Sequence, residues 1–181
     1  MKSIQTDMYQ NFVTHQCSIV GVAVKEGQQL HGVELSPGLF RRAGLLRAIQ
    51  NLGWKIKDLG DITTSDLEDK ICEVEDCTKK YKYELENCEI LGPMNEELCN
   101  IVHQAALRKD FVCILGGDHG LATGSITGML RAYENLKVVW IDAHGDCNIP
   151  ETSPSGNYHG MPAAHLMGWM SEGELKGFDW F

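Results

Sequence analysis

Two short clusters of ionisable residues carry most of the chemistry that this sequence could perform. The first is GGDH at 116–119, and the second is DAHGD at 142–146. Within the second cluster the ionisable residues stand at alternate positions, which share one face of an extended backbone. Like charges held so close together are costly unless a cation offsets them. We therefore interpret four residues as metal ligands: His119, Asp142, His144 and Asp146.

The mixture of carboxylates and imidazoles suits several divalent ions. Oxygen-rich sites favour manganese, whereas histidine also permits zinc, iron or cobalt, so ligand chemistry leaves the ion open. Carboxylates that bridge favour two ions about 3.5–4 Å apart, and such a pair makes bound water a strong nucleophile near neutral pH. The clusters therefore predict metal-assisted hydrolysis.

A polar loop follows the second cluster. It contains Asn148, Ser155, Asn157 and His159, with glycines at two positions between Ser155 and Met161. Serine and asparagine supply both hydrogen-bond donors and acceptors, which suits the amine and carboxylate of an amino acid, and glycine permits close approach of the backbone. We interpret this loop as a substrate-binding element.

The elements that must position these residues alternate between strand and helix. Apolar and β-branched runs predict four strands, at 18–24, 54–59, 111–115 and 137–141. Helical spacing and capping residues predict helices at 36–53, 95–109 and 123–134, and one from about Ala163. This order predicts an α/β fold with a mostly parallel sheet and helices on both faces, in which ligands bind beyond the carboxyl ends of the strands. The two clusters follow the third and fourth predicted strands directly.

Composition and charge exclude several classes of partner. The chain has 181 residues, of which 43% are hydrophobic and 23% charged, as expected of one soluble globular domain. Its net charge of −9 argues against nucleic acid, whose binding depends on clustered Lys and Arg. Apolar runs fall short of the roughly 18 residues that span a bilayer, and the first ten residues lack the apolar core of a secretory signal. We therefore expect a cytoplasmic protein with a small-molecule substrate and no membrane partner.

The segment 66–89 stands apart from the rest of the chain in its charge. It holds nine acids against four lysines, a net charge of −5. We interpret it as a solvated insertion, helical or looped, without a functional site. Three of the seven cysteines, Cys72, Cys77 and Cys88, lie in it, but their spacing is not the CxxC pair of zinc modules. Reduced thiols are the expectation for an odd number of cysteines without a secretory context.

These motifs resemble those of the ureohydrolases and, within them, the arginases. GGDHG at 116–120 is similar to the family's first metal motif, DAHGD at 142–146 to its second, and Asn148 with SGNYHG at 155–160 to the arginase-type loop. Weaker similarity runs through SIVGVAV, GVELSP and FRRAGLLRAI, so the resemblance covers most of the chain outside 66–89. It implies an α/β fold around a parallel sheet and a protein that usually assembles as a homotrimer.

The resemblance also implies a reaction. His119, Asp142, His144 and Asp146 resemble ligands of two manganese ions. Arginases recognise the α-amino and α-carboxylate groups of L-arginine through residues that Asn148, Ser155 and Asn157 resemble. Agmatine lacks this carboxylate. In the implied reaction a metal-bridging hydroxide attacks the guanidinium carbon and releases L-ornithine and urea. His159 would protonate the leaving amine, and Asp146 would orient the bridging water; the alternative for His159 is a loop histidine bonded to nearby backbone.

The sequence departs from the family pattern in two ways. Glycine follows both His119 and His144, where arginases commonly have hydroxyl residues, which alters the hydrogen bonds around the metal ligands. The family's later Asp-x-Asp ligands and guanidinium-binding Glu have no counterpart before Phe181. We therefore expect residues 1–181 to be the amino-terminal part of a single arginase-like domain. Two alternatives stay open: a related ureohydrolase such as an agmatinase, and a non-catalytic arginase-like protein.

Overall fold

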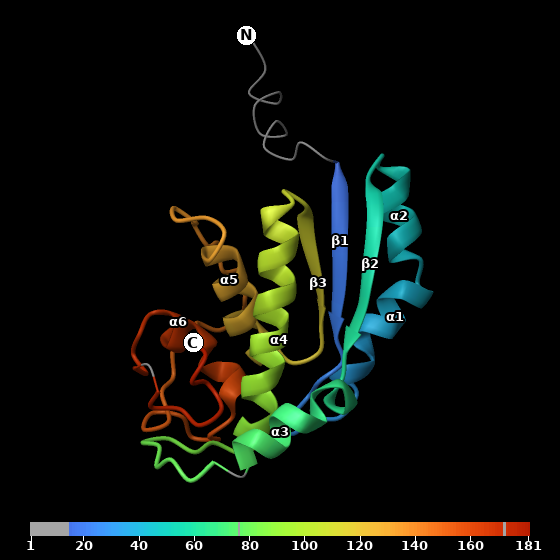
Figure 1. The fold of residues 1–181 in the computed structure, drawn as a ribbon. Coiled ribbons are helices and arrows are strands. Elements are labelled where there is room, and N and C mark those ends of the chain that lie inside the picture. Colours follow the sequence, from blue (N-terminus) through green and yellow to red (C-terminus); the bar gives the residue numbers. More distant parts are fainter. Residues whose placement is uncertain (1–14, 76, 172) are drawn as a thin grey trace.

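A three-stranded parallel sheet forms the centre of the molecule. The computed structural model describes residues 15–75, 77–171 and 173–181, so the amino-terminal segment on which the secretory-signal expectation rests lies outside the described residues. The strands are β1 (Gln16–Val22), β2 (Lys55–Ile62) and β3 (Phe111–Gly116), in the order β2-β1-β3 (Figure 1). Strand β1 pairs in parallel with both neighbours. The predicted parallel sheet is therefore confirmed.

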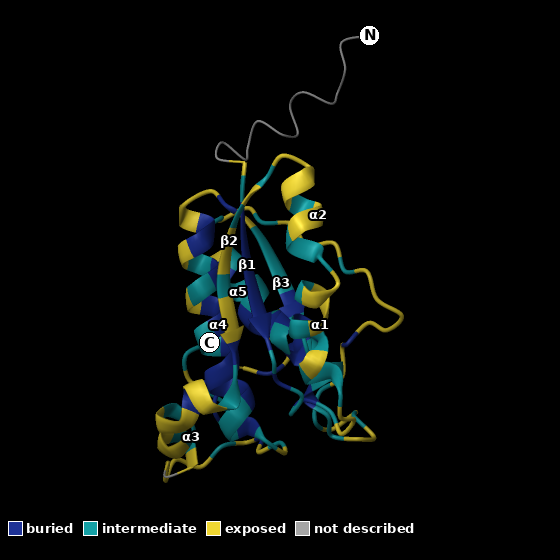
Figure 2. Cartoon of the chain, turned by 90° about the vertical axis from the view of Figure 1, so that its right-hand side faces the viewer, coloured by how far each residue is buried: buried dark blue, intermediate teal, exposed yellow. Residues whose placement is uncertain are grey.

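Helices cover both faces of this sheet, as predicted. On one face lie α1 (Ser36–Arg42) and α2 (Leu45–Asn51), and on the other lies the long helix α4 (Cys88–Leu107), with α5 (Ala122–Leu130) packed against it (Figure 1). Alternate side chains of β1 pack against the two helical layers, because successive residues of a strand point to opposite faces of the sheet. Ile19 packs with residues of α2, whereas Val20 packs with residues of α4. Figure 2 shows β1 buried between these layers.

The helix predicted at 36–53 is divided into α1 and α2. Gly44 lies between them with a φ of 90°, a left-handed conformation that ends one helix and that glycine adopts without steric cost. Pro37 stands in the first turn of α1, where its missing N–H is not needed. The spacing of apolar residues therefore predicts that these residues are helical, but it does not predict that the helix is interrupted at Gly44.

The acidic segment is partly buried. It begins within a 3-10 turn (Thr64–Leu67), which Thr63 caps, and contains helix α3 (Glu68–Glu75), which contacts α4. Leu67, Tyr83 and Cys88 are 1%, 7% and 1% exposed, so the prediction of a solvated insertion is wrong for these side chains. Lys70 on α3 forms ion pairs with two glutamates of α4. Apolar residues scattered among the charges attach the segment to the core.

The strand predicted at 137–141 is absent from the described part of the chain. These residues have no regular secondary structure, and Val139 and Ile141 are 82% and 92% exposed. A β-branched run becomes a strand only where another strand accepts its backbone hydrogen bonds, and the described sheet ends at β3. The prediction failed because periodicity carries no information about the partner.

The remaining elements are short. A 3-10 turn at Val33–Leu35 precedes α1, another at His119–Leu121 follows β3, and a third at Tyr158–Gly160 precedes α6 (Pro162–Leu166). The helix expected from about Ala163 is therefore present as α6. None of the helices in the described ranges is both long and apolar enough to cross a membrane.

Candidate metal centre and substrate cleft

His119 is positioned by the turn that follows β3. Strand β3 ends at Gly116, and the next residue, Gly117, has a positive φ of 41°. Gly117 also lies so close to the backbone of β1 that a Cβ atom on it would be 2.3 Å from the Val22 carbonyl oxygen. Only glycine fits such an approach. Asp118 then caps the following 3-10 turn, because its Oδ1 accepts a hydrogen bond of 2.6 Å from the Gly120 N–H. Burial raises the pKa of Asp118 to about 6.

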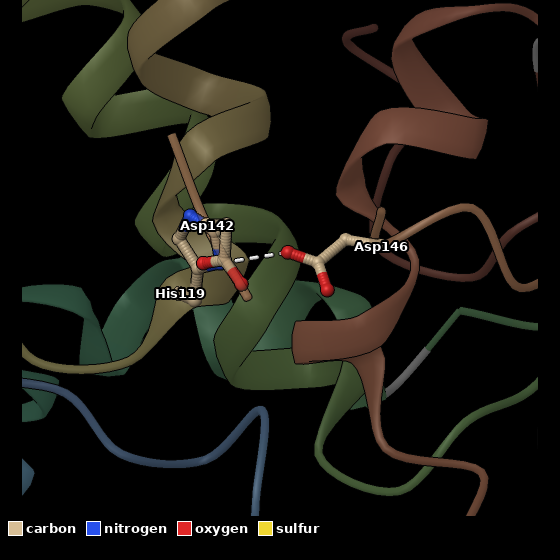
Figure 3. A group of neighbouring side chains, drawn as sticks. All are labelled: His119, Asp142 and Asp146. Carbon is tan, nitrogen blue, oxygen red and sulfur yellow. Dashed lines mark ion pairs between the residues drawn. The ribbon is translucent and has the colours of Figure 1, made fainter. Parts of the chain in front are cut away.

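Three of the four predicted metal ligands converge. One ligand atom each from His119, Asp142 and Asp146 lies within 4.8 Å of the others. His119 Nδ1 is 2.8 Å from Asp146 Oδ2 and 3.5 Å from Asp142 Oδ2. Figure 3 shows the Asp146 carboxylate pointing across toward His119 and Asp142, which lie together. The two clusters of the sequence therefore meet in space.

One oxygen of the Asp146 carboxylate is buried without a hydrogen bond. Its Oδ2 has no hydrogen-bond partner among the described residues despite its closeness to His119. Its backbone is held at a φ of 46°, and its carbonyl oxygen accepts hydrogen bonds from Ala163 and Ala164 at the start of α6. Because a buried ionised carboxylate needs a compensating partner, this donor set fits a divalent cation.

His144 lies outside this group of three. Its backbone N–H donates a 2.8 Å hydrogen bond to Asp142 Oδ1, but its side chain is 80% exposed. The expectation that residues 142, 144 and 146 share one face of an extended backbone is wrong, because the chain bends there and Asp146 is left-handed. The His144 N–H is also the main cause of a lowered pKa for Asp142. The role of His144 as a ligand stays a prediction.

All the predicted site residues line one cleft. It has a volume of about 570 Å³. The residues from the metal-ligand set and from the polar loop that line it are His119, Asp142, His144, Asp146, Asn148, Ser155, Asn157 and His159. Asn148 is held there by a hydrogen bond from its N–H to the Gly160 carbonyl at 3.1 Å. The cleft therefore joins a candidate metal centre to a wall of hydroxyl and amide groups.

Tyr158 anchors this wall and was not singled out from the sequence. It is 1% exposed, and its hydroxyl lies 2.7 Å from Thr123 Oγ1 on α5 and 2.8 Å from His165 Nδ1 on α6. Burial raises the pKa of Tyr158 and lowers that of His165 to about 4. The only signal in the sequence was one aromatic residue inside an otherwise polar loop. His165 is 1% exposed and belongs to this buried network.

Fold and site together define a member of a known class of metal-dependent α/β proteins. The sequence model of the Arginase family matches residues 15–179, and the chain belongs to that family. Arginase of Plasmodium berghei (strain Anka) is 39% identical to it, over 94% of this chain and 51% of the relative. Arginase of Bacillus caldovelox is 41% identical, over 84% of this chain and 48% of the relative.

Solved structures agree with this assignment. The crystal structure of arginase from Bacillus subtilis matches with a TM-score of 0.71 at 37% identity, and the match covers 84% of this chain and 47% of that chain. The Bacillus caldovelox arginase structure also gives 0.71, at 40% identity, over 84% of this chain and 49% of that one. The arginase-like fold is therefore established, and the chain spans about half the length of the curated relatives it matches.

Proposed function

We propose that this chain forms part of an enzyme that hydrolyses the guanidinium group of L-arginine to L-ornithine and urea. The observation that carries the proposal is the convergence of His119, Asp142 and Asp146 at one end of a cleft lined by the polar loop. Relatives that are named arginases, at 39% and 41% identity, support the same reaction.

The metal centre follows from the donor set. His119, Asp142 and Asp146, with His144 beside them, would hold the cations, for which we propose two manganese ions. When bound, the metal supplies a water molecule activated for attack near neutral pH.

The polar loop would bind the amino-acid end of the substrate. Asn148, Ser155 and Asn157 offer amide and hydroxyl groups, which can donate to a carboxylate and accept from an ammonium group. These residues are the basis for proposing arginine and not agmatine, which has no carboxylate. His159 lines the same cleft and would give a proton to the leaving amine.

Assembly and location belong to the same proposal. The family resemblance supports a cytoplasmic homotrimer. Light scattering of the purified protein tests the assembly, and a mass of one subunit would contradict it.

The direct test is a product assay of the full-length protein loaded with manganese. We expect ornithine and urea in equal amounts from L-arginine, with agmatine a poor substrate. A preference for agmatine would instead favour a related ureohydrolase. Absence of hydrolysis together with a manganese content near zero would favour a non-catalytic arginase-like protein.

A further inference from the structure

The acidic segment contacts the turn that carries part of the cleft wall. The hydroxyl of Tyr83 donates a 2.6 Å hydrogen bond to Glu151 Oε1. Tyr83 lies inside the segment 66–89, and Glu151 lies between the cleft residues Asn148 and Ser153. The segment first interpreted as a solvated insertion therefore reaches the side of the candidate substrate site.

Tyr83 is a rigid support. Its side chain belongs to the main core cluster and is 7% exposed. Its backbone is held from both directions, because its N–H donates to the Glu174 carbonyl at 2.9 Å and its carbonyl accepts from the Lys176 N–H at 3.1 Å. A hydroxyl presented from such a support loses little entropy when it forms a hydrogen bond.

Glu151 belongs to a single closed turn. The N–H groups of Thr152 and Ser153 both donate to the Ile149 carbonyl, at 2.9 and 3.0 Å. The Thr152 hydroxyl also contacts the Asn148 side-chain oxygen at 3.1 Å. Any displacement of Glu151 is therefore transmitted to Asn148 and Ser153, both of which line the cleft.

Other contacts of Glu151 are weaker. Lys82 Nζ lies 4.0 Å from Glu151 Oε1, and both side chains are about half exposed. An exposed ion pair at that distance contributes little. The hydrogen bond from the Tyr83 hydroxyl to the carboxylate is stronger, because the acceptor is charged and the ring that carries the donor is held in the core.

We propose that Tyr83 is a positioning residue that fixes the turn 148–153, and with it Asn148, for binding the amino-acid end of the substrate. This inference rests on the proposed hydrolysis of arginine. Tyr83 touches neither the candidate metal ligands nor the reacting atoms, so its effect is expected on substrate binding and not on the chemical step.

The test compares Tyr83→Phe with Tyr81→Phe in the full-length protein loaded with manganese. Tyr81 is a matched control, because its hydroxyl also donates from the same segment to a carboxylate, Asp179, at 2.5 Å, away from the cleft. For Tyr83→Phe we expect KM for arginine to rise roughly three- to tenfold, with kcat changed less than about twofold, as the loss of one partly exposed hydrogen bond implies. Tyr81→Phe should leave both constants unchanged.

Glu151 variants separate positioning from general destabilisation. Glu151→Ala should raise KM as Tyr83→Phe does, and the double variant should be no worse than either single one. Glu151→Gln keeps an acceptor oxygen and should restore most of the binding. Additive losses in the double variant would overturn the proposal.

Amide hydrogen exchange decides the coupling without an activity assay. In Tyr83→Phe, but not in Tyr81→Phe, the hydrogen-bonded amides of Ile149, Thr152 and Ser153 should exchange faster. Equal exchange in the two variants would overturn the proposed coupling. If the wild-type protein is inert toward arginine, the proposed function fails, while the exchange comparison still decides whether Tyr83 fixes this turn.

Discussion

The buried carboxylate of Asp146 faces the imidazole of His119 across 2.8 Å, and its near oxygen accepts no hydrogen bond among the described residues. The two residues come from different loops, one after β3 and the other before α6. A carboxylate in that position would be stabilised by a cation that it and the imidazole both bind. The relationship makes Asp146 the candidate ligand whose removal is most informative.

Replacement of Asp146 by Asn should weaken metal binding. The variant keeps the shape of the side chain but removes the charge that offsets the cation, so we expect manganese affinity to fall at least about tenfold. Titration calorimetry measures this directly. Glu68→Gln, at an exposed position on α3, removes the same charge elsewhere and should leave affinity unaltered. Equal affinities for Asp146→Asn and wild type would exclude Asp146 from the centre.

His144 needs a separate test, because it lies beside the group of three and not within it. If it is a ligand, His144→Ala should bind less manganese per chain and lose most of its activity. His159→Ala is the comparison, since it removes a histidine from the same cleft and should keep its metal while losing activity. Full manganese content in His144→Ala would show that His144 is not a metal ligand.

Asn157 offers a test of substrate selection. Its side chain lines the cleft on the polar loop. In Asn157→Ala we expect KM for arginine to rise about tenfold with the metal retained, because a hydrogen bond to a charged substrate group is lost. The preference for arginine over agmatine should shrink in the same proportion. An unchanged KM in steady-state assays would remove Asn157 from the binding site.

Acid should weaken the fold through His165. Burial lowers its pKa from 6.5 to about 4 in the folded protein, so between these values the unfolded chain binds the proton more readily. The His165 contribution is therefore nil above pH 6.5 and grows as the pH drops toward 4, reaching a loss of roughly 2 kcal/mol between pH 7.5 and pH 5. Asp118, whose pKa is raised to about 6, offsets part of this loss, because the folded protein binds its proton more readily than the unfolded chain does.

Urea unfolding of metal-free protein measures this effect, because metal release then does not contribute. His165→Asn keeps an acceptor for the Tyr158 hydroxyl but cannot titrate, so its stability should change less over the same interval. A pH dependence identical in the variant and the wild type would show that other groups cause the acid sensitivity.

Much of the fold could be predicted because its signals are local. The strands at 18–24, 54–59 and 111–115 were recognised from β-branched runs, and the structure places β1, β2 and β3 there within a few residues. The run 137–141 carries the same signal and forms no strand, because pairing depends on a neighbour that lies elsewhere in the chain. Gly44 shows the converse, since one backbone conformation divides a helix whose apolar spacing is continuous.

The sequence predicts which residues belong to the candidate site more completely than it predicts how they are arranged. The motif spacing identified His119, Asp142 and Asp146, which converge. It did not place His144, because the left-handed backbone of Asp146 is not visible in a count of residues. Tyr83 was hidden by the charges around it, and only its burial and its bond to Glu151 distinguish it.

The exposed run ending at Ile141 has a practical consequence for handling the polypeptide. Val139 and Ile141 are 82% and 92% exposed, and β3 is one of the two edge strands of the described sheet. Uncovered β-branched segments and open strand edges are templates for pairing between molecules. We therefore expect residues 1–181 expressed alone to self-associate, and charged replacements at these two positions to improve its solubility.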